Sequence, residues 1–155
     1  MENKVNVKPL EQDLIDALQE KEQEGIQLLQ ITEGENPKQT VQNIRTYVDK
    51  LLEENHSEDE LREYALQLGT IWGIMVIKKY GWTWKYLDFG DDIHGIYLVS
   101  PKEYYCCPPL YFLNKILLSE NTGLDGNNDN TVMLLFNMLE GIENRKPKSK
   151  FQVIS

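Results

Sequence analysis

The run from Ser57 to Ser100 constrains the fold most strongly, because it predicts one long helix that leads into a β-hairpin. Ser57 is followed three residues later by Glu60, which is the spacing of a capping box at a helix start. Near the other end, the positive charges of Lys78 and Lys79 interact favourably with the helix dipole, and Gly81 is the expected C-terminal cap. The apolar residues of this run recur at steps of three and four: Leu61, Tyr64, Ala65, Leu68, Trp72, Val76 and Tyr80. Such a stripe is typical of a helix packed against a core.

Gly69 and Gly73 lie four residues apart on one face of the predicted helix. Each costs about 1 kcal/mol relative to alanine in a helix interior, so a structural or functional reason for both is expected. One interpretation is the close approach of another helix or strand, with Trp72 beside the contact. The other is a ligand that lies against the bare backbone, in a pocket between this helix face and the sheet.

The segment after Gly81 predicts a short antiparallel β-meander of three strands. Strands are expected over 82–87, 93–99 and 104–107, with turns at 89–92 and 100–103. Pro108 and Pro109 end the third strand, because proline cannot donate to a sheet ladder.

Helices are expected on both sides of this unit. Apolar periodicity predicts N-terminal helices over about 9–30 and 37–54, while residues 1–8 are expected to fray. Two C-terminal helices are expected over 110–118 and 131–142, separated by a polar loop. In the tail, Phe151, Val153 and Ile154 fit either an edge strand or a disordered end.

These elements predict an α+β fold in a single domain over residues 1–155. It comprises an N-terminal helical part (1–56), an α+β core (57–142) and a tail (143–155). The charged, Gln-rich N-terminal helices are compatible with packing on this core or with formation of a homodimer.

The chain is acidic, with 25 Asp and Glu against 16 Lys and Arg and a formal charge of −9. This balance opposes binding to nucleic acid and to anionic membranes and favours a basic partner, although an acidic surface also simply maintains solubility. The N-terminus lacks the apolar region of a signal peptide. Cys106 and Cys107 are adjacent, without metal-ligand spacing, and are expected to be buried free thiols. We therefore expect a cytoplasmic protein.

No residues are predicted to be catalytic, to bind a cofactor or to hold a metal. Asp125, Asn127 and Asp129 fit positions one, three and five of a calcium loop, but Asn130 and Phe136 stand where glycine and a bidentate carboxylate are required. A polar turn that caps the last helix explains the same residues.

The first hairpin is the remaining candidate site. Asp88, Asp91 and Asp92 lie near His94, and a carboxylate with a histidine can perform acid–base chemistry. Asp is also common in turns, which is the simpler explanation. His56 lies beside the cap of the main helix and is expected to be exposed to solvent.

Aromatic residues are concentrated in the same region, and most of them must be core. A three-stranded sheet packs on helices through one face, so alternate residues such as Trp82 and Trp84, or Tyr97, are candidates for an exposed face. Trp84 and Tyr86 beside Asp88, Asp91 and Asp92 would form a partner-binding surface with aromatic anchors and acidic steering.

Several of these residues form a pattern: Leu68-Gly69-x-x-Trp72-Gly73, Gly81-Trp82-x-Trp84, Tyr97-x-Val99-Ser100-Pro101, Pro109 with Phe112, and Asp129-Asn130-Thr131 before an apolar helix. Over about residues 57–142, this pattern resembles small bacterial proteins of uncharacterised function. Some of those are similar to immunity proteins of polymorphic toxin systems. The resemblance implies a cytoplasmic binder that neutralises a basic toxin domain, and it assigns no site residues.

The leading hypothesis is therefore a non-enzymatic protein-binding protein of the inhibitor or adaptor class. The alternative is a small-molecule-binding protein or enzyme with its pocket at the Gly69 and Gly73 face.

Overall fold

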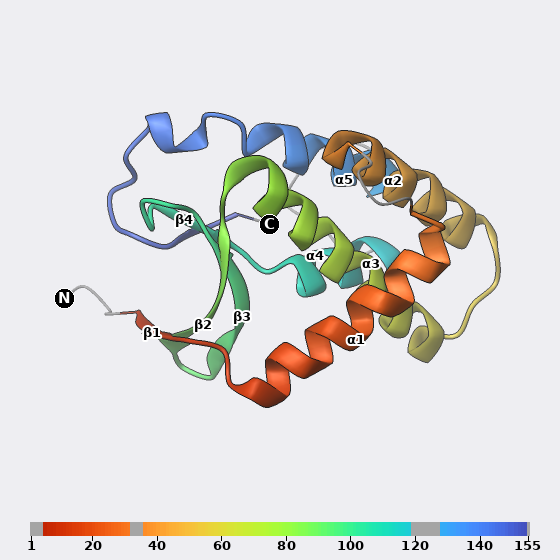
Figure 1. The fold of residues 1–155 in the computed structure, drawn as a ribbon, viewed down its shortest axis with the longest axis horizontal. Coiled ribbons are helices and arrows are strands. Elements are labelled where there is room, and N and C mark those ends of the chain that lie inside the picture. The colour runs from red at the N-terminus through yellow and green to blue at the C-terminus, as the bar shows by residue number, and fades with distance from the viewer. Residues whose placement is uncertain (1–4, 32–35, 119–127, 155) are drawn as a thin grey trace.

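A computed structural model describes residues 5–31, 36–118 and 128–154, with only the backbone of 128–131 (Figure 1). In these ranges the helices are α1 (Gln12–Leu29), α2 (Pro37–Glu53), α3 (Glu58–Tyr80), α4 (Pro109–Leu117), α5 (Asn128–Met138) and the 3-10 helix η1 (Ile142–Asn144). The strands are β1 (Asn6–Lys8), β2 (Thr83–Gly90), β3 (Ile93–Val99), β4 (Tyr105–Cys107) and β5 (Gln152–Val153). The predicted α+β class is confirmed.

The sheet has five strands in the order β1-β2-β3-β4-β5. The meander β2-β3-β4 is antiparallel, as the sequence predicts. Two strands extend it. β1 pairs antiparallel with β2, so the prediction that residues 1–8 fray is wrong for Asn6–Lys8. β5 pairs parallel with β4, which shows an edge strand in the tail and makes the sheet mixed.

The long helix α3 begins and ends where its sequence predicts. The Ser57 hydroxyl accepts a hydrogen bond from the Glu60 amide at 3.2 Å, and the Glu60 carboxylate accepts one from that hydroxyl at 3.3 Å. Gly81 closes the helix in the left-handed region, at φ 78°. Other boundaries differ: α1 begins at Gln12 rather than Pro9, and α5 runs from Asn128 to Met138, with η1 following it.

The helices pack around α3, which contacts α1, α2 and α4, while α5 packs on α2 and α4. The N-terminal helices therefore pack on the rest of the fold. Trp72 of α3 is fully buried in the main core, where its indole Nε1 donates a hydrogen bond of 3.1 Å to the Val132 carbonyl. Its ring lies against those of Phe112 and Phe136, at centroid distances of 5.2 and 6.2 Å.

Gly69 and Gly73 are contact positions between packed elements. A Cβ on Gly69 would lie 2.9 Å from the Pro109 carbonyl oxygen and 3.0 Å from the Leu110 Cα. A Cβ on Gly73 would lie 2.5 Å from the Trp84 ring. The packing interpretation of these glycines is confirmed, and α4 and Trp84 occupy the space that the pocket interpretation requires.

The two faces of the sheet have different surroundings. Trp84, Leu98 and Cys107 lie on the inner face and belong to the main core beneath the helices. Leu87, Val99 and Cys106 lie on the outer face in a separate small cluster. The partly buried residues packed on that cluster come from strands and chain ends: Val5, Phe89, Tyr97 and Phe151. Figure 1 shows the labelled helices to the right of the strands.

None of the described helices combines the length and apolar character needed to cross a bilayer.

Candidate functional site

The β2–β3 hairpin ends in a tight acidic turn. Gly90 pairs with Ile93, so Asp91 and Asp92 form a two-residue loop. Both have positive φ, at 53° and 63°, as a type I′ turn requires. Asp and Asn adopt this backbone conformation more readily than most residues. Asp91, Asp92 and Ile93 are exposed. We call Asp88, Asp91, Asp92 and Ile93 the hairpin end.

The structure separates the predicted partner-binding residues into two groups. Trp84 is half-buried against Gly73 and the main core, and Trp82 is only 2% exposed, so neither indole ring stands on an open face. Tyr86 lies nearer the tip, where its hydroxyl contacts Nδ1 of His94. Of the five predicted residues, Tyr86 and the three aspartates are near the turn.

Asp88 supports the turn rather than acid–base chemistry. It lies opposite His94 in the ladder, but its carboxylate accepts a hydrogen bond of 2.9 Å from the Gly90 amide. The bond stabilises the register shift between Asp88 and Gly90. Within the described ranges, no three His, Cys, Asp or Glu side chains gather in a way that could hold a metal ion. Of the calcium-loop candidates, Asp125 and Asn127 lie outside those ranges, and Asp129 is described by its backbone alone.

The prediction that His56 is exposed is wrong, since its side chain retains only 15% exposure. Its Nδ1 lies 2.9 Å from Glu60 Oε2 and its Nε2 lies 3.2 Å from Glu54 Oε1. The ring also meets Tyr64 edge-on at 5.6 Å. The hydrogen bond with Glu60, and then that with Glu54, raises the pKa of His56 above 6.5. The same contact with His56 lowers the pKa of Glu60 below 4.5.

We expect His56 to titrate above 6.5 in an NMR pH titration, and Glu60→Gln to lower its midpoint more than Glu54→Gln does. A raised histidine pKa stabilises the fold below pH 6.5 and ceases to do so as pH rises through the folded-state pKa. Because the pKa of Glu60 is lowered, its carboxylate stabilises the fold above pH 4.5, and this stabilisation is lost as pH falls through the folded-state pKa. The stabilising contributions of His56 and Glu60 are therefore both present between pH 4.5 and pH 6.5. An unchanged His56 midpoint in Glu60→Gln would contradict the assignment.

Both cysteines are free and buried, as predicted. They lie on opposite faces of the sheet: Cys107 in the main core and Cys106 in the outer cluster. Burial raises the pKa of the Cys106 thiol to about 12 and raises that of Cys107 as well. Since the thiolate is the nucleophile, neither group is placed for covalent catalysis at neutral pH.

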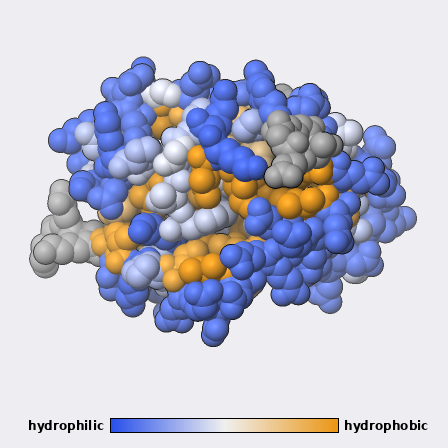
Figure 2. Space-filling model, in the orientation of Figure 1, coloured by the Kyte–Doolittle hydropathy of each residue, from blue (hydrophilic) through white to orange (hydrophobic). Residues whose placement is uncertain are grey.

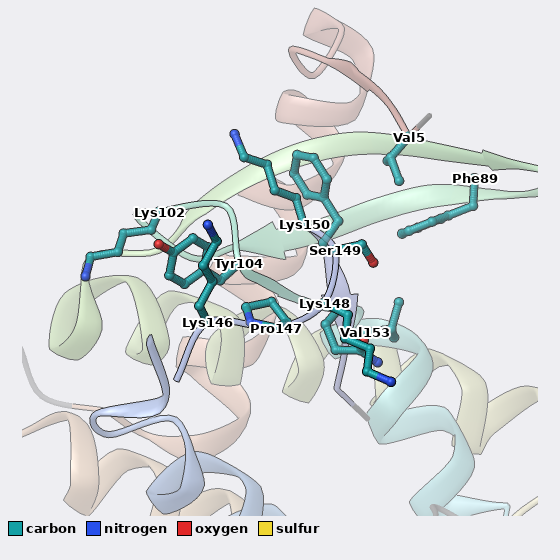
Figure 3. Close-up of a pocket in the computed structure, with 12 residues that line it drawn as sticks. Val5, Phe89, Lys102, Tyr104, Lys146, Pro147, Lys148, Ser149, Lys150 and Val153 are labelled. Atoms are coloured by element: carbon teal, nitrogen blue, oxygen red, sulfur yellow. The ribbon is translucent and has the colours of Figure 1, made fainter. Parts of the chain in front are cut away.

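A groove of about 1070 Å³ lies over the outer face of the sheet (Figure 3). Apolar side chains line part of it, namely Val5, Phe89, Phe151 and Val153. Four lysines also line it, together with Tyr104 and residues of the 147–152 segment: Lys102, Lys146, Lys148 and Lys150. In Figure 3, Lys102, Tyr104 and Lys146 lie at one end, and Val5 and Phe89 at the other.

The segment that carries three of these lysines, 143–154, is anchored to the sheet at several points. The Glu143 carboxylate accepts hydrogen bonds from the Ser100 hydroxyl at 2.6 Å and the Lys102 amide at 2.9 Å. Tyr105 donates from its hydroxyl to the Arg145 carbonyl at 2.8 Å. The amides of residues 151, 152 and 154 each donate to the 103–106 strand region at 2.9 Å. The lysines therefore project from a fixed backbone.

The lysines differ in their charge partners. Lys150 pairs with Glu103 at 3.5 Å, and Lys102 lies 5.8 Å from the centre of the Tyr104 ring. Lys146 and Lys148 are exposed and make no ion pair with the described residues. The sequence predicts a charged tail over 143–155, with an edge strand or a disordered end, and no binding role for its charges. The missed feature was four basic residues within 145–150, without an acidic one, in a chain of charge −9.

Comparison of this chain with protein-family models, curated proteins and solved structures finds no match.

Proposed function

We propose that this is a non-enzymatic protein-binding protein that uses its hairpin end to contact a basic partner. The observation that carries the proposal is the pair Asp91 and Asp92, both exposed at the tip of a hydrogen-bonded turn and both without an ion pair to the described residues. Ile93 beside them is 56% exposed and supplies apolar contact area. Fixed charges around an apolar contact favour fast association and a defined orientation.

The proposal revises the expected surface and includes the function that the resemblance suggests. Trp84 packs against Gly73, so Tyr86, Phe89 and Ile93 are the large side chains near the acidic turn. An inhibitor of a basic toxin domain would bind through this end by charge complementarity. We place the protein in the cytoplasm, where two buried free thiols remain reduced.

Replacing Asp88, Asp91 and Asp92 together by asparagine is the direct test. Asparagine preserves the acceptor for the Gly90 amide and tolerates positive φ, so the turn should persist while three charges are removed. At about 0.5 kcal/mol for each exposed charge pair, we expect roughly tenfold weaker binding at low salt and a smaller salt dependence. The partner is first captured from source-cell lysate or culture medium and identified by mass spectrometry, and its affinity is then measured by titration.

The matched control is Glu58→Gln with Asp59→Asn. These residues are 77% and 96% exposed in the first turn of α3, at the end of that helix remote from the strands. Their ion pairs among the described residues are with exposed Arg62, so their replacement should leave partner affinity unchanged. If the three asparagines left affinity and its salt dependence at wild-type values, the hairpin end would not be the binding surface.

A further inference from the structure

The outer face of the sheet is mainly apolar, with Lys85 opposite Tyr97 as a charged residue within it. Two pairs of residues that lie opposite each other on neighbouring strands point to this face: Val7 with Leu87, and Cys106 with Val153. Phe89 and Tyr97 also belong to it, with their rings in edge-on contact at 5.3 Å. Three large hydrophobic residues of this face remain well exposed: Val7 at 36%, Val153 at 42% and Ile93 at 56%.

No described helix packs on this face, because the outer cluster consists of strand and chain-end residues alone. In Figure 2, hydrophobic residues reach the surface across the centre of the view, including the part left of centre where Figure 1 places the strands. An apolar patch rimmed by charge is typical of a protein interaction site.

The charges at the two ends of this face have opposite sign. Phe89 lies at one end of the groove and is two residues from Asp91, so that end adjoins the acidic turn (Figure 3). Lys102 and Lys146 lie at the other end. The face therefore runs from an acidic end, across apolar side chains, to a basic end.

We propose that the occupant of this face is a second copy of the chain, related by a two-fold axis. Rotation about such an axis reverses the direction of the face, so each copy's Asp91 and Asp92 meet the other's Lys102 and Lys146. The apolar residues then meet in the middle. A two-fold interface requires a self-complementary surface, and this charge order supplies one. The charge pairs set the register, and apolar burial supplies the binding free energy.

Other classes of occupant match only part of the face. An acidic peptide or nucleic acid would find the lysines at one end but would approach Asp91 and Asp92 at the other, on a chain of charge −9. This inference rests on the proposed function in one respect, since both assign contact to the hairpin end. A basic partner would accordingly compete with the second copy for Asp91 and Asp92.

Sedimentation velocity of the full chain tests the proposal over a range of concentrations, at low salt and at about 0.15 M salt, where the Debye length is about 8 Å. We expect a reversible dimer of twice 18.1 kDa that weakens as salt increases. Lys102→Glu with Lys146→Glu should weaken dimerisation at least about tenfold, as should Asp91→Lys with Asp92→Lys, because each creates like-charge contacts. Circular dichroism verifies that both variants are folded.

Mixing the two variants makes the test specific. In their heterodimer every reversed charge faces a reversed partner, so equimolar mixing should restore a dimer that neither variant forms alone. Lys38→Glu with Lys50→Glu on α2 is the control, because it makes the same charge change at exposed positions outside the groove and should dimerise like wild type. A nucleic-acid or acidic-peptide site would instead appear as binding of labelled single-stranded RNA or poly-glutamate by the monomer, which the lysine variant abolishes.

Three results would overturn the inference: a monomeric wild type at all concentrations, a dimer that both variants form at wild-type strength, or mixing that restores nothing. The proposed function is separable from it. A monomer that loses its basic partner on Asp→Asn replacement would overturn the dimer alone. If the protein dimerises as expected but captures no basic partner, only the proposed partner binding would be overturned.

Discussion

Trp72→Ala is expected to lower the free energy of unfolding by about 3–5 kcal/mol. The Trp72 side chain is fully buried, so its removal leaves a cavity between the rings of Phe112 and Phe136. It also removes the donor to the Val132 carbonyl, which is 60 residues away in the chain. Because domains are stable by only about 5–15 kcal/mol, the variant should lose a large fraction of its stability. Urea denaturation followed by circular dichroism measures the change.

Trp72→Phe separates the two contributions. Phenylalanine keeps much of the buried ring but cannot donate a hydrogen bond, so we expect an intermediate loss of about 1–3 kcal/mol. A Trp72→Ala variant that loses less stability than Trp72→Phe would show that this indole does not organise the core.

Gly69→Ala is the second prediction with a large effect, and its sign opposes helix propensity. Alanine in an ordinary helix interior would stabilise the protein by about 1 kcal/mol. Here the added Cβ would meet backbone atoms of Pro109 and Leu110, which cannot rotate away as a flexible side chain can. Overpacking of this kind costs about 1–3 kcal/mol, so we expect net destabilisation of roughly 1 kcal/mol as α4 is pushed from α3. Urea denaturation again measures the change.

Gly95→Ala is the matched control, because nothing lies within 4 Å of its Cβ position and its φ is not positive. Its free energy of unfolding should stay within about 0.5 kcal/mol of wild type. Stabilisation by Gly69→Ala would mean that α3 and α4 are not in close contact at this glycine.

The elements that the sequence predicts correctly are those set by local interactions. The Ser57 cap and the Gly81 terminus of α3 depend on residues within one helical turn. The alternation in β2 and β3 is likewise local, although the turn predicted over 89–92 is confined to Asp91 and Asp92, because Phe89 and Gly90 belong to β2. These patterns predict the α+β class and the meander.

The errors concern pairings between distant segments. β1 is too short to be recognised by periodicity, and the sequence left β5 open between an edge strand and a disordered end, because each depends on a strand far away in the chain. The candidate surface was misassigned for the same reason. Trp84 looks like an exposed aromatic anchor in the sequence, but Gly73 leaves space for its ring against α3. The four basic residues in 145–150 were visible in the sequence, but their place over the outer face was not.

The sequence by itself therefore determined the caps and course of α3, the hairpin with its acidic turn, and the charge of each segment. Only the tertiary structure decided which sheet face the helices cover, that the tail docks as β5, and that acidic and basic groups lie at opposite ends of one apolar face. The physical reason is that caps and turns are satisfied by backbone groups a few residues away. The coverage of a sheet face depends on contacts between segments that local patterning leaves unspecified.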